Sequence, residues 1–363
     1  MKMARILFGL MLSACMCACS QRASNKNGEV DITPKKLAVA DTLVTFYEDY
    51  PAFLDVRDDR LCVTLVKSDT CLALFDKHSG NLVKRLGVKG KGPQDMQSPE
   101  FVKNGPLVDA GRFVFYDLNQ QKLFFLDKDG ELGDFSPLTA RYGSLNVTAD
   151  YIVGHSTGFD PSLFLVKDRK TGEEKAMELH PKLPESQEER LKDMLRYMYS
   201  PHVLCNEAQN RIVLAMYFFD LVQIYNFQGE LQKTLTLGEE KDFGQMVSEL
   251  TNNGDYWGYS SAYATKDFCY LRRTLNEGAT GEGKQSQIMK MDWEGRVMDI
   301  YNLDVVPDGG FCVDEDGKLY AITHDIVEDE EVFLLLAFDE RKGRMKGNFE
   351  VYCMKLAQLK EIL

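Results

Sequence analysis

Four aromatic side chains stand close together in one polar stretch of the sequence, and their types and spacing suit the binding of a ligand. The stretch contains Tyr256, Trp257, Tyr259 and Tyr263, interleaved with glycine, serine and asparagine. Flat rings flanked by amides and hydroxyls match the faces of sugars or an extended peptide. The stretch therefore predicts a ligand-binding surface, and the alternative is that the same rings pack onto their own domain.

Catalytic chemistry has only scattered candidates. The five histidines stand apart from one another and from the cysteines, which disfavours a zinc site. The candidate polar groups are His78, His155, His180, His202 and His324, with Asp55, Asp160, Asp304, Asp308 and Asp325. No G-x-S-x-G, H-E-x-x-H or paired-carboxylate motif occurs in the sequence. We therefore predict no catalytic residue, no metal and no cofactor.

Composition and charge narrow the possible partners. The chain has 363 residues, of which 44% are hydrophobic and 27% charged, and these proportions are typical of a packed soluble protein. The 43 Lys and Arg against 56 Asp and Glu leave a net charge of -13. A chain with this surplus of carboxylates repels a phosphate backbone, so we expect no nucleic-acid partner.

Residues 1–14 have the layout of a secretory signal peptide, with two basic residues, an apolar run and small residues before a cysteine. The sequence Leu12-Ser13-Ala14-Cys15 resembles the lipobox of bacterial lipoproteins, and Cys19 is the alternative acylated cysteine. Acyl chains hold a soluble domain on a membrane surface. We expect a flexible tether over residues 15–33 and an exported protein anchored by lipid. Its expected location is the outer membrane, facing the periplasm or the cell exterior.

One pattern occurs six times along the rest of the chain: an apolar strand ending in Asp or Asn, a turn containing Gly, and a second strand. The acidic or amide positions are Asp76, Asp127, Asp168, Asn226, Asp292 and Asp339. Asp or Asn binds the backbone amides of the turn, and Gly supplies the positive φ of a tight hairpin. Another apolar strand precedes each copy. A period of about fifty residues with about four strands predicts a six-bladed β-propeller over residues 34–363, with a β-sandwich as the alternative.

Three further segments have a predicted place in this ring. Residues 37–46 are suited to close it by adding a strand to the last sheet. Residues 184–199 carry apolar side chains at helical spacing after a Pro and Glu start, which predicts a short helical insertion. The long segment 238–263 is an insertion between blades, and such insertions gather on one rim of a propeller, where binding surfaces usually lie.

The six cysteines of this region lie mostly inside apolar runs and form no C-x-x-C pair. We expect buried thiols that pack as small apolar side chains. A disulfide between Cys62 and Cys71, across a hairpin, is the alternative.

A glycine-rich stretch after the first hairpin carries a family resemblance. Its matching positions are Gly87, Gly90, Gly92, Pro93, Met96 and Pro99, in the form G-x-x-G-x-G-P-x-x-[FM]-x-x-P. Through this stretch the sequence resembles the TolB-like and NHL-like six-bladed propeller lipoproteins of Bacteroidetes. The resemblance implies the fold and a lipoprotein location more than a reaction. By itself the stretch is a tight crossing between blades, since it lacks the Gly-Lys-Ser/Thr end of a phosphate loop.

These observations predict an all-β, lipid-anchored propeller that binds a protein or glycan as a non-catalytic binding or scaffolding module. The alternative is a metal-assisted hydrolase or lyase at the mouth of the central channel, with His155 or His324 among its polar groups. A channel lined by three or more converging carboxylates and a histidine would favour the enzyme. A channel of apolar or small residues would favour binding.

Overall fold

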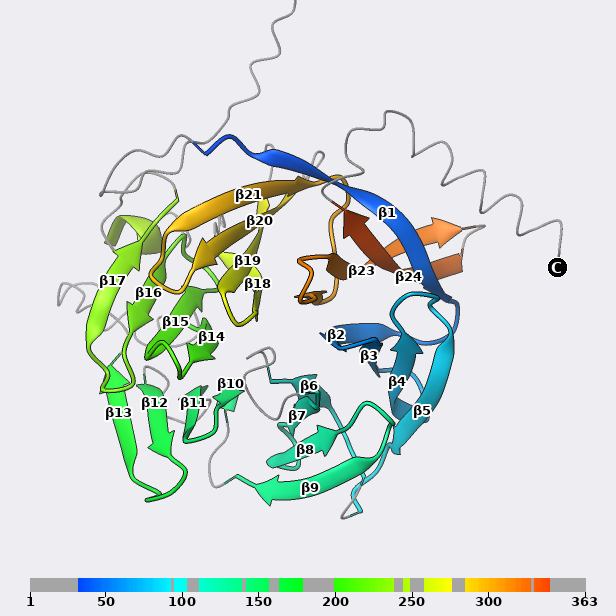
Figure 1. Cartoon of the computed structure of the whole chain (residues 1–363), viewed down its shortest axis with the longest axis horizontal. Coiled ribbons are helices and arrows are strands. Elements are labelled where there is room, and N and C mark those ends of the chain that lie inside the picture. The colour runs from blue at the N-terminus through cyan, green and yellow to red at the C-terminus, as the bar shows by residue number, and fades with distance from the viewer. Residues whose placement is uncertain are drawn as a thin grey trace, which may run out of the picture.

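The strands form six antiparallel sheets arranged as sectors around a central axis in this computed structural model (Figure 1). Four sheets have four strands each. The other two are joined into one eight-stranded sheet by β1 (Lys35–Phe46), which lies between them. The prediction of a six-bladed β-propeller is confirmed, and the β-sandwich is wrong.

The structure describes residues 32–92, 95–102, 111–138, 142–156, 163–178, 199–237, 244–248, 258–275, 285–327 and 330–339. The predicted signal peptide at 1–14, the acylation candidates Cys15 and Cys19 and the helix predicted at 184–199, except for Tyr199, lie outside these ranges. Among the described residues, helix occurs at residues 244–248. No helix in this part of the chain is long and apolar enough to span a membrane.

Each blade begins at the channel and proceeds outward in chain order. Blade 1 contains β2 (Pro51–Arg57), β3 (Arg60–Leu65), β4 (Thr70–Asp76) and β5 (Leu82–Val88). Blade 2 contains β6 (Pro99–Phe101), β7 (Phe113–Asp117), β8 (Lys122–Leu126) and β9 (Leu132–Pro137). Blade 3 contains β10 (Tyr142–Val147), β11 (Tyr151–Ser156), β12 (Leu163–Asp168) and β13 (Glu174–Glu178).

The second half of the ring repeats this order. Blade 4 contains β14 (Pro201–Asn206), β15 (Arg211–Met216), β16 (Val222–Tyr225) and β17 (Leu231–Leu235). Blade 5 contains β18 (Tyr259–Ala264), β19 (Phe268–Leu275), β20 (Gln285–Asp292) and β21 (Val297–Leu303). Blade 6 contains β22 (Phe311–Val313), β23 (Leu319–Val327) and β24 (Glu330–Asp339), with β1 as its outer strand.

The repeated Asp and Gly positions form the turns between the third and fourth strands. In blade 1, Asp76 Oδ1 accepts hydrogen bonds from the backbone amides of Ser79 (2.9 Å) and His78 (3.2 Å). Gly80 follows with φ +70°, a conformation that costs an L side chain roughly 1–2 kcal/mol. The equivalent turns of blades 2 to 5 also end in a glycine with positive φ, at Gly130, Gly172, Gly229 and Gly295. The hairpins predicted from sequence in blades 1 to 5 are therefore confirmed. The turn of the sixth copy, after Asp339, lies outside the described residues.

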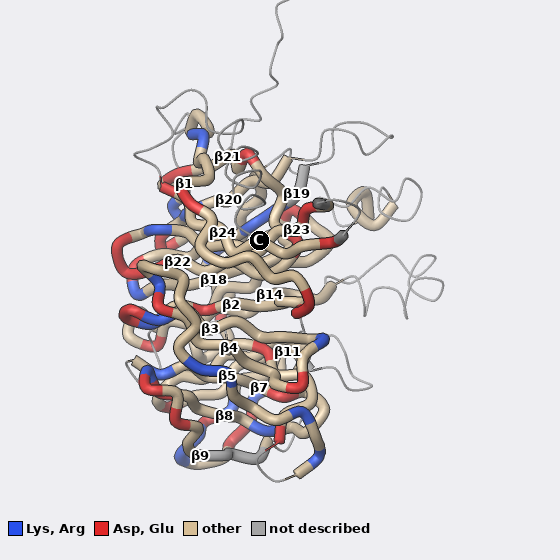
Figure 2. The backbone as a smooth tube through the Cα atoms, turned by 90° about the vertical axis from the view of Figure 1, so that its right-hand side faces the viewer, with Lys and Arg blue, Asp and Glu red and all other residues tan. Residues whose placement is uncertain are grey.

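Three blades are each linked to the next blade by a lysine on the outer strand. Each lysine contacts the turn between the third and fourth strands of that next blade. Lys84 Nζ of β5 donates to the carbonyl of Gly130 at 2.8 Å, and Lys233 Nζ of β17 donates to the carbonyl of Gly295 at 3.0 Å. Lys175 of β13 contacts the carbonyl of Gln228 in the same way. Basic and acidic segments are interspersed along the chain (Figure 2). These contacts are therefore local links between blades and not part of a basic face.

The first strand closes the ring, as predicted for residues 37–46. β1 pairs with β24 in antiparallel register, from Ala38 opposite Asp339 to Phe46 opposite Phe333. The strand also pairs in parallel with β21, which the sequence did not predict. Closure therefore pairs the first described strand with the last one, in the outer part of blade 6.

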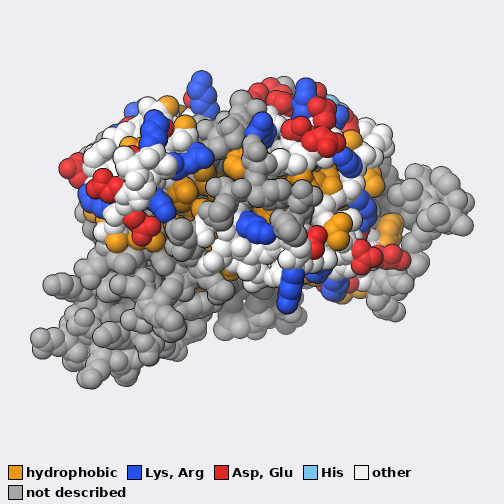
Figure 3. All heavy atoms as spheres, turned by 90° about the horizontal axis from the view of Figure 1, so that it is seen from below, with side chains coloured by type: hydrophobic (Ala, Val, Ile, Leu, Met, Phe, Trp, Pro, Cys, Tyr) orange, Lys and Arg blue, Asp and Glu red, His pale blue; other side chains and the backbone are white. Residues whose placement is uncertain are grey.

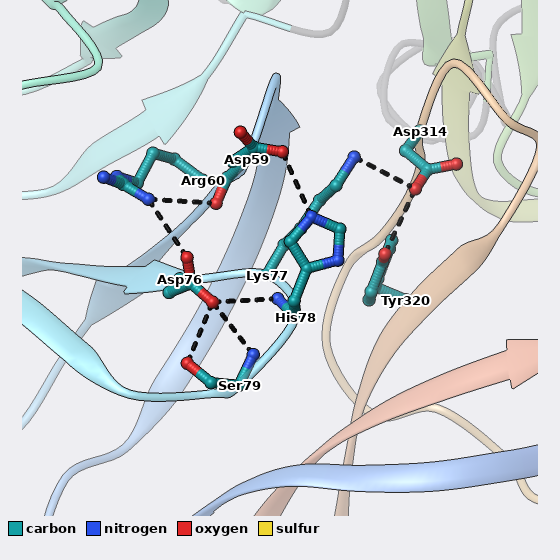
Figure 4. Close-up of polar contacts among 8 residues, drawn as sticks. All are labelled: Asp59, Arg60, Asp76, Lys77, His78, Ser79, Asp314 and Tyr320. Atoms are coloured by element: carbon teal, nitrogen blue, oxygen red, sulfur yellow. Dashed lines mark hydrogen bonds and ion pairs between the residues drawn. The ribbon is translucent and has the colours of Figure 1, made fainter.

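A polar network reinforces the junction between blade 1 and blade 6 (Figure 4). Lys77, in the turn after β4, lies 3.5 Å from Asp314, in the turn after β22, and both side chains are largely buried. The Tyr320 hydroxyl donates to the same Asp314 oxygen at 3.1 Å. The junction therefore has an ion pair in addition to the β1 ladder.

The core consists of apolar side chains between neighbouring blades. The largest cluster, which includes Phe46, Phe311 and Leu335, spans blades 1, 5 and 6. The described cysteines are free and buried: Cys62, Cys71, Cys205, Cys269 and Cys312. The prediction of thiols packed as apolar side chains is confirmed for these five, and Cys62 and Cys71 form no disulfide. The sixth, Cys353, lies outside the described residues.

Candidate functional site

A small cavity lies between the inner strands of blades 1, 2, 5 and 6. Its volume is about 20 Å³, enough for about one water molecule. Residues from β2, β6, β18 and β22, together with flanking positions, line it: Phe53, Leu54, Asp55, Glu100, Phe101, Val102, Ser261, Ala262, Tyr263, Gly310 and Phe311. Most of this wall is apolar or small.

Two of the lining residues, Asp55 and Tyr263, form a hydrogen-bonded group with Arg57. Asp55 Oδ1 accepts from the Tyr263 hydroxyl at 2.7 Å and from Arg57 Nη1 at 2.8 Å. Asp55 Oδ2 lies 2.7 Å from Arg57 Nη2. All three residues are at most 5% exposed. Because β2 and β18 belong to blades that are not neighbours, this group bridges the ring across blade 6.

The charges of this group are set by burial and pairing. Burial raises the pKa of the Asp55 carboxyl, while the neighbouring Arg57 charge and the Tyr263 hydrogen bond oppose the rise. Arg57 Nε also donates to the carbonyl of Arg112, in blade 2, at 3.1 Å. We therefore interpret Asp55 and Arg57 as a buried ion pair, and such a pair needs its remaining hydrogen bonds to be tolerated.

Of the four aromatic residues predicted to bind a ligand, two are described. Tyr263 lines the central cavity and is 4% exposed. Tyr259 begins the same inner strand and is fully buried. Tyr256 and Trp257 lie outside the described residues. Tyr259 and Tyr263 pack within their own domain, which was the alternative to ligand binding. The inner strand places both rings between blades.

Both ends of the insertion that contains Tyr256 and Trp257 meet at one carboxylate. Tyr259 donates its hydroxyl hydrogen to Asp220 Oδ1 at 2.9 Å, and the Leu237 backbone amide donates to Asp220 Oδ2 at 3.1 Å. Arg273 Nη1 lies 3.6 Å from the same carboxylate. In the helical turn at residues 244–248, Val247 is buried in the core of blades 3 and 4. The insertion is thus fixed at its two ends and at one internal point.

The histidines suggested for a channel mouth do not line the cavity. His155 lies within β11 and His324 within β23, and both of these are second strands, one position away from the channel. His155 is buried, whereas His324 is exposed and contacts Asp308 through Nδ1. Within the described residues, no group of three or more His, Cys, Asp or Glu side chains is placed to hold a metal.

The glycine-rich stretch is a crossing from blade 1 to blade 2, as its composition indicated. It connects β5 to β6, and Met96 packs fully buried between these blades. The buried Asp117 carboxylate accepts hydrogen bonds from the amides of Gln97 (2.6 Å) and Ser98 (3.1 Å). The crossing is therefore fixed by protein groups and has a structural role.

Asp55 is among the candidate polar groups identified from the sequence. Arg57, Glu100 and Asp220, which also lie at these sites, are not. Asp55 and Arg57 are two residues apart on an otherwise apolar strand, which places both on the same face. That spacing was an available signal for a buried ion pair. No local pattern marks Asp220, because its partners come from two other segments.

The ring is a six-bladed β-propeller with a small cavity between its inner strands. The loops that connect one blade to the next lie on one face. Residues 30–316 match the family model for TolB-like six-bladed propellers. The chain therefore belongs to the TolB-like six-bladed propeller family.

Solved structures similar to this chain include two from Bacteroides. A member of the DUF4221 family from Bacteroides vulgatus is 12% identical with a TM-score of 0.48, covering 85% of this chain and 97% of its own. A Bacteroides fragilis protein described as exported is 12% identical with a TM-score of 0.48, covering 84% and 94%. A streptogramin B lyase is 11% identical with a TM-score of 0.43, covering 82% and 100%. No curated protein matches the sequence significantly.

Proposed function

We propose that this protein is an exported, lipid-anchored propeller that binds a protein or glycan without transforming it. The ligand would occupy the face where the inner strands begin and where the insertion between β17 and β18 lies. Propellers use the loops on one face in this way because the blades hold those loops on a rigid ring. The described part of this face includes Tyr217, which is 37% exposed.

The observation that carries the proposal is the wall of the central cavity. Apolar and small residues make up most of it, and its two carboxylates are Asp55 and Glu100. Asp55 is already bonded to Arg57 and Tyr263. A metal-assisted hydrolase needs several carboxylates or histidines converging on one point. A wall of mostly apolar and small residues, without three carboxylates and a histidine among the lining residues, supports binding rather than catalysis.

Attachment of both ends of the insertion to Asp220 supports the choice of face. A loop whose ends are fixed loses less conformational entropy when a ligand orders it. Tyr256 and Trp257 belong to this loop, and we propose them as ligand contacts. Tyr259 would position the loop from beneath through its bond to Asp220.

Capture of partners from native membranes tests the proposal. Tagged full chain is compared with the double variant Tyr256→Ala, Trp257→Ala and with a control double variant on the opposite rim, Lys128→Ala, Glu131→Ala. We expect the first variant to lose a partner that the control retains. If both variants capture the same partners as the wild type, the proposed rim is wrong.

Attachment to the membrane has a separate test. We expect Cys15→Ser to abolish incorporation of radiolabelled palmitate and to release the protein from membranes, while Cys19→Ser leaves both unchanged. Labelling that depends on Cys19 would move the acylation site to that residue. Labelling of neither would contradict the anchor. Protease treatment of intact cells then distinguishes the periplasmic from the exterior side.

A further inference from the structure

We propose that the guanidinium of Arg272, between blades 5 and 6, binds a glutamate carboxylate of a protein ligand. This inference rests on the proposed function, because it names the chemical group that the ligand would offer to the ring. Arg272 lies in the second half of β19 and contacts the carbonyl of Pro307, in the crossing from β21 to β22. Crossings between blades lie on the face where the inner strands begin, which is the face proposed for the ligand.

The first argument comes from a comparison of the buried arginines. Three arginines in the described part of the chain are buried: Arg57, Arg272 and Arg273. Arg57 lies 2.7 Å from Asp55, and Arg273 lies 3.6 Å from Asp220. Arg272 forms no ion pair with any described residue. Because arginines are rarely buried without a paired charge, Arg272 lacks a partner that the other two have.

The second argument is the charge of Arg272. Burial lowers the pKa of this side chain to about 10, so the guanidinium still carries its proton at neutral pH. The charge of Asp308 opposes the effect of burial. Asp308, however, accepts a hydrogen bond from the backbone amide of His324 at 3.0 Å and contacts the Nδ1 atom of the same residue. The Arg272 charge is therefore only partly compensated, and a bound carboxylate would complete its compensation.

The third argument is that Arg272 has donors to offer. Its Nη1 atom donates to the carbonyl of Pro307. Its Nε atom is buried and has no hydrogen-bond partner in the described part of the chain. Its Nη2 atom also makes no hydrogen bond with the described residues, but it is not among their buried unpaired atoms. Nη2 is therefore open to solvent, and a ligand oxygen can approach it from the surface.

The recessed position of the guanidinium selects the kind of carboxylate. Arg272 is only 5% exposed, so the ligand group has to extend beyond the rest of its own molecule. A glutamate side chain carries its carboxylate at the end of a flexible chain, whereas the carboxylate of an acidic sugar is attached directly to the ring. A guanidinium also matches the planar geometry of a carboxylate. These properties favour a glutamate of a protein over an acidic glycan.

The test uses the full chain in detergent, at constant ionic strength, and small probes of defined charge. The probe is Nα-acetyl-glutamate amide, whose one carboxylate is on the side chain. The corresponding glutamine amide has the same shape without the charge, and glucuronate represents an acidic sugar. The unfolding midpoint is measured against probe concentration, since a ligand of the folded state raises it by mass action. We expect the glutamate amide to raise the midpoint and the other two probes to leave it unchanged.

Three variants assign the effect to the guanidinium, each compared with its own midpoint without probe. Arg272→Met should weaken binding of the glutamate amide about tenfold or more, as expected for loss of a charged hydrogen-bond partner. Arg272→Lys keeps the charge without the planar fork, so its affinity should lie between those of Arg272→Met and the wild type. Arg296→Met, in an exposed turn on the opposite rim, is the matched control and should bind like the wild type.

Three results would overturn the inference: no shift with the glutamate amide, an equal shift with the glutamine amide, or an unchanged response in Arg272→Met. A larger shift with glucuronate that depends on Arg272 would contradict the choice of a protein glutamate.

The membrane capture assay separates this inference from the proposed function. Capture that depends on Trp257 without a response to the glutamate amide would leave the rim standing and remove the Arg272 site. A response that depends on Arg272 without capture through Trp257 would do the reverse.

Discussion

Two adjacent arginines of β19 are buried to the same degree but differ in how their charge is compensated. Arg273 donates through Nε (2.9 Å) and Nη2 (2.7 Å) to Gln287 Oε1, and it lies beside Asp220. Arg272 contacts the carbonyl of Pro307, while its buried Nε has no hydrogen-bond partner. Burial lowers the pKa of Arg272 to about 10. The buried charge of Arg273 is therefore better compensated than that of Arg272.

This difference predicts opposite effects of the same substitution. Arg272→Met removes a poorly compensated buried charge, so its free energy of unfolding should equal or exceed that of the wild type. Arg273→Met leaves Asp220 and Gln287 without their partner and should lower the free energy of unfolding by about 2 kcal/mol or more. Urea denaturation at pH 7 measures both. Equal losses in the two variants would contradict the assignment.

An ion pair near the rim of blade 1 predicts a pH dependence. Arg85 Nη1 donates to Asp49 Oδ1 at 3.1 Å, and this bond lowers the pKa of Asp49 below its ordinary value of 3.8. Because the folded pKa is below the unfolded one, the stabilisation is present above pH 3.8 and is lost as the pH falls through the folded pKa. Asp49→Asn should be less stable than wild type by roughly 0.5 to 1 kcal/mol at pH 7. In acid titrations followed by circular dichroism, this difference should vanish well below pH 3.8, and a constant difference would argue against the pair.

At the residue scale, sequence identified chemical types but not their partners. The cluster of aromatic residues was visible in the sequence, yet the partner of Tyr263 is Asp55, 208 residues away. Which face of a strand is buried, and against which blade, depends on ring geometry that no local pattern contains. The polar group below the cavity could therefore not be assembled from sequence alone.

At the scale of single elements, the turns between third and fourth strands were predictable because their chemistry is local. Asp or Asn accepts hydrogen bonds from amides two to four residues ahead, and Gly takes the positive φ. The inner strands lack such a signature. β6 and β22 have three residues each, too few to show a period. Histidines on second strands were consequently expected at the channel mouth.

Two glycines with the same backbone conformation provide a matched test of what the turns contact. Gly80 has φ +70°, and a Cβ there would lie 2.2 Å from the carbonyl oxygen of Leu43 in the closing strand. Gly172 has φ +75° with nothing within 4 Å of its Cβ position. Gly172→Ala should cost about 1 kcal/mol from conformation alone. Gly80→Ala should cost at least twice as much, because the closing strand must also move.

Thermal and urea unfolding of both glycine variants measure the difference. An additional variant, Gly172→Asn, checks the conformational part, since Asn tolerates positive φ better than Ala. It should recover part of the stability lost in Gly172→Ala. Equal costs for Gly80→Ala and Gly172→Ala would mean that the blade 1 turn does not support β1.

At the scale of the whole molecule, the blade number followed from repetition, because each blade is one unit of about fifty residues that needs neighbours to bury its faces. The family resemblance rested instead on the glycine-rich stretch after the first hairpin. The face shown in Figure 3 carries charged side chains of both signs mixed with apolar ones. No single sign of charge dominates that face. Overall charge on this face therefore does not point to a partner of one sign.

Ring closure makes the strongest prediction about the whole molecule. β1 forms ladders with both β24 and β21, so its removal exposes the edges of two blades at once. It also contributes Leu37 and Phe46, which are buried in the largest core cluster. Unpaired edges are templates for association with other chains. Deletion of residues 1–46 should therefore abolish cooperative unfolding and produce aggregates, whereas deletion of residues 1–33 should leave a cooperative transition close to that of the full chain.

Differential scanning calorimetry and size-exclusion chromatography compare the two deletions. Adding a synthetic peptide with the sequence of residues 34–47 to the shorter chain is the decisive control. If β1 acts only by pairing, the peptide should restore a monomeric, cooperatively unfolding ring at a midpoint that rises with peptide concentration, as mass action requires. A shorter chain that unfolds cooperatively without the peptide would show that blades 5 and 6 hold together through their faces, and that β1 is not what closes the propeller.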